Sequence, residues 1–85
     1  MAHDTELVHH PVVRTICFSR DHEENIVVFT LKGGRILKVP IGDFPELSRA
    51  PDRVRENWRL IGGGRGVHWP DIDLDLSVDG LLRDY

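Results

Sequence analysis

Residues 12–18 form a mainly apolar run broken only by Arg14 and Thr15, which predicts a β-strand at the start of the ordered chain. The segment is rich in β-branched residues, and these favour strands. Alternation places Val13, Thr15 and Cys17 on one side of the strand and the remaining residues on the other. We therefore expect Cys17 to be a small hydrophobic residue of the core rather than a nucleophile.

Two further segments predict that this strand belongs to an antiparallel meander. Residues 26–31 are apolar on both faces, as is typical of a central strand. The pair Gly33-Gly34 supplies the positive φ angles that a tight hairpin requires. Residues 35–39 carry a lysine and stop at Pro40, which cannot donate a hydrogen bond to a sheet. We therefore expect a third strand near an edge.

After Pro40 the alternation stops, and a short helix is predicted. Asp43 is expected to cap this helix, because its carboxylate can accept from the first free N–H groups. The helix runs through Leu47, presents Phe44 and Leu47 on one face and tolerates Pro45 in its first turn.

A second helix is predicted to begin at residues 50–52. Proline suits the first helical position, and Asp52 suits the positive end of the helix dipole. Ala50, Val54 and Trp58 lie four residues apart and form the inward stripe. The side that faces water carries Arg53, Arg55 and Glu56.

The C-terminal third is organised around the glycine-rich segment 62–66. Residues 59–61 are expected to be extended before it, and residues 67–70 to form a short strand that proline closes. Ser77 is predicted to cap a last helical turn or two that ends near Leu82. The apolar residues expected to face the core are Trp58, Ile61, Trp69, Ile72, Leu76 and Leu81.

Together these elements predict an α+β fold: a three-stranded antiparallel N-terminal meander followed by short helices and a glycine-jointed C-terminal segment. With 85 residues and no low-complexity linker, the chain is expected to form a single domain over residues 11–85. Residues 1–10 are polar and aperiodic, which predicts a flexible N-terminus.

Composition narrows the classes of partner. The formal net charge is -3, from 11 basic and 14 acidic residues, which argues against a nucleic acid held mainly through its phosphates. The single cysteine cannot form an intrachain disulfide, and no apolar stretch suits a signal peptide or a membrane span. We therefore expect a cytoplasmic protein without direct nucleic-acid or membrane binding.

The sequence GGGRG of residues 62–66 invites comparison with phosphate-binding loops. A P-loop needs a lysine and a hydroxyl residue after its last glycine, whereas Val67 and His68 follow here. A dinucleotide-binding loop leads from a strand into a helix, but this loop leads towards a strand-like segment. The glycines are better explained by a backbone that turns sharply or approaches another chain closely.

Asp71, Asp73 and Asp75 alternate as carboxylates do at the start of an EF-hand calcium loop. That loop also requires glycine at its sixth position and glutamate at its twelfth, where this sequence has Leu76 and Leu82. We therefore expect no metal site, but an amphipathic edge with its apolar residues inward and its carboxylates outward.

His68, with Asp71 and Asp73 nearby in sequence, is the best candidate for acid–base chemistry. A neighbouring carboxylate can tune an imidazole near neutral pH. The motif offers no nucleophile other than Ser77, which is expected to cap a helix. No catalytic residue and no cofactor are therefore predicted.

A family resemblance is carried by two segments: NWRLIGGGRGVHWPDIDLDLSVDGLL, residues 57–82, and VPIGDFPEL, residues 39–47. They resemble the bacterial domain of unknown function 2442 family (DUF2442). The resemblance covers most of the chain from the first strand onward and is densest from residue 40 to residue 82. One departure is Ala50, where the family commonly has Ser or Thr, which implies a weaker cap on the second helix.

The resemblance implies a compact α+β fold and no settled enzymatic activity. Many family members look like the smaller partner of two-gene, toxin–antitoxin-like modules. By analogy we expect a non-enzymatic protein-interaction role, with the adjacent-gene product as partner. The alternatives are a DNA-binding accessory role and a small enzyme centred on His68. An open strand edge would also allow a homodimer. The candidate interaction residues are Phe44, Pro45, Trp58, Gly62, Gly64, Gly66, His68, Trp69, Pro70, Asp71, Asp73 and Asp75.

Overall fold

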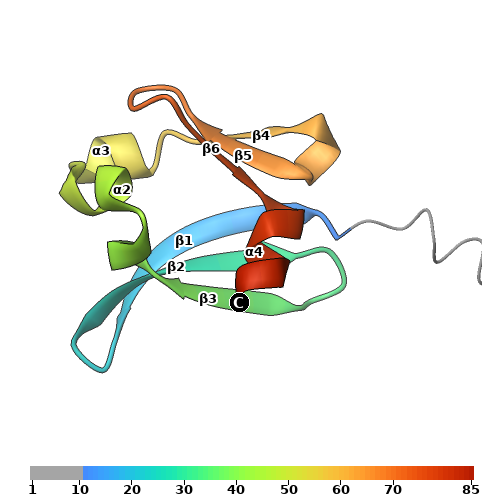
Figure 1. Ribbon diagram of the computed structural model, residues 1–85, viewed down its shortest axis with the longest axis horizontal. Coiled ribbons are helices and arrows are strands. Elements are labelled where there is room, and N and C mark those ends of the chain that lie inside the picture. Colours follow the sequence, from blue (N-terminus) through green and yellow to red (C-terminus); the bar gives the residue numbers. More distant parts are fainter. Residues whose placement is uncertain (1–10) are drawn as a thin grey trace, which may run out of the picture.

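The computed structural model describes residues 11–85 and contains two antiparallel sheets of three strands each (Figure 1). The first sheet joins β1 (Val13–Asp21), β2 (Glu24–Leu31) and β3 (Ile36–Pro40) in that order. The second sheet joins β4 (Arg59–Ile61), β5 (Gly66–Trp69) and β6 (Leu74–Ser77) in that order. The α+β class and the N-terminal meander with β2 at its centre are confirmed. The predicted flexible N-terminus, residues 1–10, lies outside the described residues.

Short helices connect and flank the two sheets. Between the sheets lie η1 (Ile41–Asp43), α2 (Pro45–Arg49) and α3 (Asp52–Arg55). The 3-10 turn η2 (Gly62–Gly64) joins β4 to β5, and α4 (Val78–Asp84) follows β6. Within residues 11–85, every helix is too short or too polar to cross a membrane.

The two sheets share one hydrophobic core. Figure 1 shows the second sheet lying over one face of the first, with α4 between them at one end. A single cluster of buried side chains connects β2 and β3 with α2, β5 and α4. Its largest fully buried members are Trp69, Phe29, Leu31, Leu47, Val27, Val39, Val67 and Val78.

Strand β1 contains an irregularity that changes which of its residues face the core. The pairing with β2 shifts register between Val13 and Thr15, so one extra residue is inserted there. Val13 and Ile16 are consequently both buried, at 2% and 5% exposure, although strict alternation would separate them. Cys17 is exposed, so the prediction that it belongs to the core is wrong.

Two tight turns close the meander. Gly33 and Gly34 have φ angles of +95° and +96°, which confirms the predicted reason for the glycine pair. The turn between β1 and β2 is built from His22 and Glu23, with φ angles of 51° and 68°. A type I′ hairpin turn requires positive φ at both central positions. Asn-Gly adopts these angles more easily than His22-Glu23 does.

The first helix does not begin as predicted. Residues 41–43 form η1, and α2 starts only at Pro45, with Phe44 at the N-cap and no side-chain cap. The predicted cap by Asp43 is therefore wrong. Its carboxylate instead accepts a hydrogen bond from the Tyr85 hydroxyl at the C-terminus.

The second helix, α3, is only four residues long. Val54 is buried at 6% exposure, as predicted, but Trp58 lies beyond the helix and is half-buried against the core. The N-cap is Pro51 and its side chain offers no hydrogen bond, which leaves the first N–H groups of α3 without a side-chain acceptor.

The last helix begins as predicted. Ser77 accepts a hydrogen bond from the Gly80 N–H at 3.0 Å and caps α4. Of the residues predicted to face inward, Trp69 and Leu81 are buried, and Trp58, Ile72 and Leu76 are partly buried against the core. Ile61 is 40% exposed, so its inward placement is wrong. It pairs with Gly66 on the outer face of the second sheet.

Candidate functional site

A polar row crosses the outer face of the second sheet. Arg59 is the register partner of His68, and His68 is the register partner of Asp75. Directly opposite residues in antiparallel strands point to the same side, so these three side chains lie next to one another. The flanking Val67 and Trp69 are both 0% exposed and point to the core. The row therefore lies on the face that points away from the core.

His68 and Asp75 form a closely held pair within this row. The Nδ1 of His68 is hydrogen-bonded to Oδ1 of Asp75, and the two side chains are 26% and 65% exposed. A carboxylate in this position orients the imidazole and leaves Nε2 as the atom that can meet a ligand. The sequence pointed to Asp71 and Asp73 as the partners of His68, and that prediction is wrong.

The nearest hydroxyl on the same face belongs to Ser77, two residues after Asp75 in β6. Its oxygen accepts the Gly80 N–H as the cap of α4. A nucleophile would need to approach the imidazole as a hydrogen-bond donor. Ser77 is thus engaged in the structural role predicted for it.

The carboxylates of the β5–β6 turn are separated by different partners. Asp71 Oδ2 accepts from Asn57 Nδ2 at 2.9 Å, and Asp75 is held by His68. Asp73 sits at the turn with a φ of 52°. Pro70 begins the turn and is half-buried. In the part of the chain that the structure describes, no group of three or more His, Cys, Asp or Glu side chains converges on a metal position.

An open groove lies beside the polar row, where Gly66 leaves the sheet without a side chain. A Cβ at Gly66 would come within 3.1 Å of Ile61 Cγ1 and 3.2 Å of the Leu76 carbonyl oxygen. The groove has a volume of about 360 Å³. Ile61, Gly62, Arg65, Gly66, Ser77 and Asp79 line it. An apolar floor between Arg65 and Asp79 suits a side chain of a partner protein better than a phosphate.

The glycine-rich loop has a packing role. Gly62, Gly63 and Gly64 all have positive φ angles, so the chain turns sharply between β4 and β5. A Cβ at Gly64 would lie 3.0 Å from both Val12 Cβ and the Val13 carbonyl oxygen. The loop therefore presses against the start of β1, so the predicted sharp turn is confirmed, and the close approach is to a strand of the same chain.

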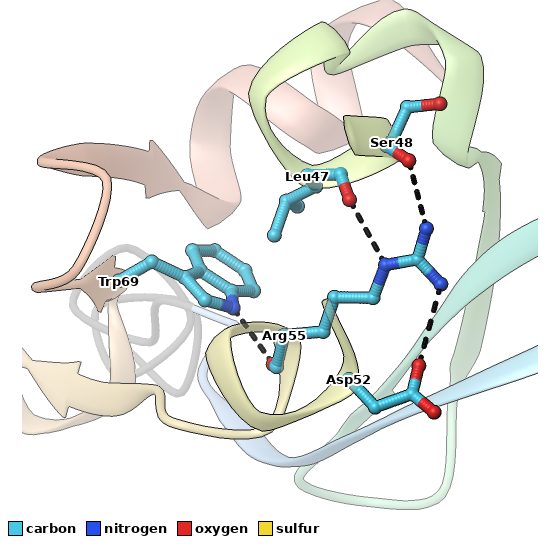
Figure 2. A network of polar contacts seen from close by, with 5 residues as sticks. All are labelled: Leu47, Ser48, Asp52, Arg55 and Trp69. Carbon is cyan, nitrogen blue, oxygen red and sulfur yellow. Dashed lines mark hydrogen bonds and ion pairs between the residues drawn. The ribbon is translucent and has the colours of Figure 1, made fainter. Parts of the chain in front are cut away.

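Trp69 anchors the interior and is not available at the surface. Figure 2 shows its indole beside Leu47, with Nε1 directed at the backbone of Arg55. The ring is 0% exposed, and Nε1 donates to the Arg55 carbonyl oxygen at 2.9 Å. Trp69 was predicted as an interaction residue, but its side chain belongs to the core on the opposite side of the second sheet from the polar row.

Arg55 is the residue that the sequence analysis placed wrongly in water. Its Nε donates to the Leu47 carbonyl oxygen and its Nη2 to the Ser48 carbonyl oxygen, both at 2.9 Å (Figure 2). Asp52 Oδ1 lies 3.8 Å from Nη1. This placement depends on the short length of α2, which ends after five residues and leaves carbonyl groups that accept from Arg55.

The other predicted site residues lie apart from the polar row. Phe44 and Pro45 belong to the start of α2, where Phe44 packs on the core and Pro45 is exposed. Trp58 borders a separate hollow of about 320 Å³ near the middle of β1. The structure therefore brings together His68, Asp75 and Gly66 from the predicted set, and adds Arg59 and Ile61 to them.

Comparison with known proteins places the chain in a family. The family model described as "Protein of unknown function (DUF2442)" matches residues 21–85. The chain belongs to the DUF2442 family. A crystal structure of a protein of unknown function from Rhodospirillum rubrum ATCC 11170 is similar, with 26% identity and a TM-score of 0.72. The similarity covers 89% of each chain, so this DUF2442 protein shares its fold with that structure over nearly its whole length. Among curated proteins, none matches.

Proposed function

We propose that this DUF2442 protein is a non-enzymatic protein-interaction module whose partner docks along the exposed edge strand β4 of the second sheet. The observation that carries the proposal is the exposure of β4. All three of its residues are exposed, and Leu60 and Ile61 are two of the large hydrophobic side chains left in water, at 38% and 40%. An exposed apolar edge strand is a liability unless something covers it.

The geometry favours a partner that adds a strand along β4. Among the described strands, β4 pairs only with β5, so its other edge has free N–H and C=O groups. An added strand would hydrogen-bond there, and one of its side chains would enter the groove beside Ile61 and Gly66. The polar row of Arg59, His68 and Asp75 would supply the polar rim of the contact.

Within this proposal the partner is the adjacent-gene product, as in toxin–antitoxin-like modules, and the pair meets in the cytoplasm. The family resemblance motivates this finer assignment. Co-expression of the tagged chain with its gene neighbour tests it. We expect the neighbour to co-purify with the wild type and with Ile36→Lys, a control on the other sheet, but not with Ile61→Lys. A wild-type chain that retains no neighbour would contradict the antitoxin-like role.

An enzymatic role would depend on the His68–Asp75 pair. His68→Ala removes one side chain of the polar rim while leaving β4 and the groove in place, so the interaction role predicts weaker but retained capture of the partner and a cellular effect that follows that capture. If the cellular effect is lost while the partner still binds, His68 takes part in a reaction, and the enzymatic role gains support. A direct role on DNA predicts retardation of the upstream operator at low salt, and we expect none at a net charge of -3.

A further inference from the structure

The first sheet has a second, uncovered face. The opposite face of β1–β2–β3 carries the cross-strand row Ile16, Phe29 and Leu37, which is buried in the core shared with the second sheet. Two cross-strand rows build the uncovered part of this face: Thr15, Thr30 and Ile36 in one, and Cys17, Val28 and Lys38 in the other. A third row, Ser19, Ile26 and Pro40, lies next to them, and there Ile26 is covered, at 7% exposure. We call this surface the outer face of the first sheet.

The outer face is poor in charge. Lys38 is the one charged residue in the two rows, although 29% of the chain is charged. Ile36 is 56% exposed, the most exposed large hydrophobic side chain among residues 11–85. A β-branched and nearly uncharged sheet face is the kind of surface that packs against another sheet.

The two ends of the first sheet carry opposite charge. The β1–β2 turn brings together Asp21, Glu23 and Glu24. The opposite end, at the β2–β3 turn and the start of β1, brings together Arg14, Lys32 and Arg35. Figure 1 shows these two turns at opposite ends of the sheet. Arg20 offsets part of the acidic end, but by alternation it belongs to the face that looks inward.

We propose that a second copy of this chain docks on the outer face of the first sheet, with its strands running in the opposite direction. A two-fold axis in the plane of the contact places the acidic end of each copy over the basic end of the other. The same surface is used on both copies, as a closed dimer requires. The charge pattern favours this occupant because it is complementary to itself only in the antiparallel orientation.

The edge of the first sheet is a poorer surface for a second copy. Pairing two β3 strands around their centre would place Lys38 opposite its own copy, and like charges directly opposite are destabilising. Pro40 at the end of β3 lacks the N–H that a ladder needs. The outer face is therefore a better dimer contact than the β3 edge.

The contact area predicts a weak dimer. Three strands of about six residues give a patch of roughly 15 by 20 Å. Such a patch, roughly 600 Å² over both copies, is smaller than the roughly 1,200 Å² of a standard specific interface, so the dimer is transient and forms only at high protein concentration. Because charged ends contribute to it, salt weakens the dimer.

Sedimentation equilibrium of the full chain at low salt tests whether the outer face of the first sheet is a dimer contact. We expect the wild type to dimerise with rising concentration, Ile36→Lys to shift the Kd at least about tenfold towards monomer, and Ile61→Lys to dimerise as the wild type does. A wild type that stays monomeric at every accessible concentration overturns the proposal. A dimer that is lost in Ile61→Lys but kept in Ile36→Lys also overturns it. Loss of neighbour-protein capture in Ile36→Lys overturns it as well, because the two surfaces would then not be separate.

Charge reversal tests the antiparallel orientation. The pair Glu23→Lys and Glu24→Lys leaves cations at both ends, and Lys32→Glu with Arg35→Glu leaves anions at both ends, so each pair is expected to weaken the dimer. Combining all four substitutions again gives the two ends of the sheet opposite charges, and this variant is expected to have the wild-type Kd. A combined variant as weak as either pair would refute the antiparallel arrangement. Arg53→Glu with Glu46→Lys, on exposed helix positions, is the matched control.

Discussion

At the scale of single residues, Arg55 connects the parts of this small molecule. Its guanidinium satisfies two carbonyl groups at the end of α2, and its own carbonyl accepts from buried Trp69. We predict that Arg55→Ala lowers the free energy of unfolding by about 2 kcal/mol, because it removes two hydrogen bonds from the charged guanidinium to the end of α2 together with the packing of a half-buried side chain. Chemical denaturation measures this change. Arg53→Ala, an equal loss of charge at an exposed position, should change stability by less than about 0.5 kcal/mol.

Gly64 gives a second prediction at this scale. Its φ is +96°, and a Cβ added there would lie 3.0 Å from Val12 Cβ and from the Val13 carbonyl oxygen. Gly64→Ala suffers both backbone strain and a clash, so we expect it to lose about 2–3 kcal/mol of stability. Gly63→Ala has a similar φ of +68° with nothing within 4 Å, and should lose only about 1 kcal/mol. Equal losses in the two variants would show that the loop does not press on β1.

The hydrogen bond to Asp43, with smaller contributions from desolvation and from the charges of Asp43 and Asp84, raises the pKa of Tyr85 from 10.0 to about 12. The unfolded chain ionises first, so the stabilisation is complete below pH 10 and is lost as the pH rises towards 12. Ultraviolet titration should show a late transition, because this is the single tyrosine of the chain. Relative to Tyr85→Phe, the wild type should lose stability across that interval, and an ordinary tyrosine transition near pH 10 would contradict the contact.

Several residue placements could not be derived from the sequence, for identifiable reasons. Cys17 faces water because of the bulge after Val13, and a bulge leaves no mark in an alternating pattern. Arg55 is half-buried because α2 ends early, which alternation does not show. Ile61 faces outward because Gly66 is its cross-strand neighbour, and that neighbour is known only once the register is known.

At the scale of elements, the two turns of the first sheet offer a direct comparison. The β2–β3 turn uses glycines for its positive φ angles, whereas the β1–β2 turn uses His22 and Glu23. We predict that His22→Asn with Glu23→Gly raises the free energy of unfolding by about 1 kcal/mol, since these residues fit a type I′ turn without strain. Thermal unfolding at high salt, where the proposed dimer is suppressed, measures it. Gly33→Ala should lower stability by about 1 kcal/mol, and a loss from both changes would argue against the turn type.

The first sheet could be predicted element by element because its information is local. Apolar, β-branched runs marked the first two strands, a glycine pair marked one turn and a proline marked the end of β3. The helices were predicted less well, since α2 and α3 span only five and four residues and lack the side-chain caps that mark a boundary. Ser77 is the instructive exception, because there a cap residue does form its hydrogen bond.

At the scale of the whole molecule, the second sheet is what the sequence did not reveal. Its strands have three or four residues, and the apolar side of β6 looks like an isolated amphipathic edge until β5 is placed beside it. Only this pairing brings His68 against Asp75 and opens the groove at Gly66. The family could be identified from the sequence, but the surface for a partner required the three-dimensional arrangement.

This arrangement gives the molecule two surfaces with different proposed occupants. The exposed strand β4 faces one way for a partner protein, and the outer face of the first sheet faces another way for a second copy. The variants Ile61→Lys and Ile36→Lys separate the two, because each changes an exposed isoleucine on one sheet only.

Amide hydrogen exchange of the chain with and without its purified gene neighbour tests the central claim most directly, because strand addition protects backbone N–H groups. We predict slower exchange at residues 59–61 in the complex, no change at residues 36–40 when total protein concentration is held below the dimer range, and no protection at 59–61 in Ile61→Lys. A complex in which residues 59–61 exchange as fast as in the free protein would contradict the assignment of β4 as the docking strand.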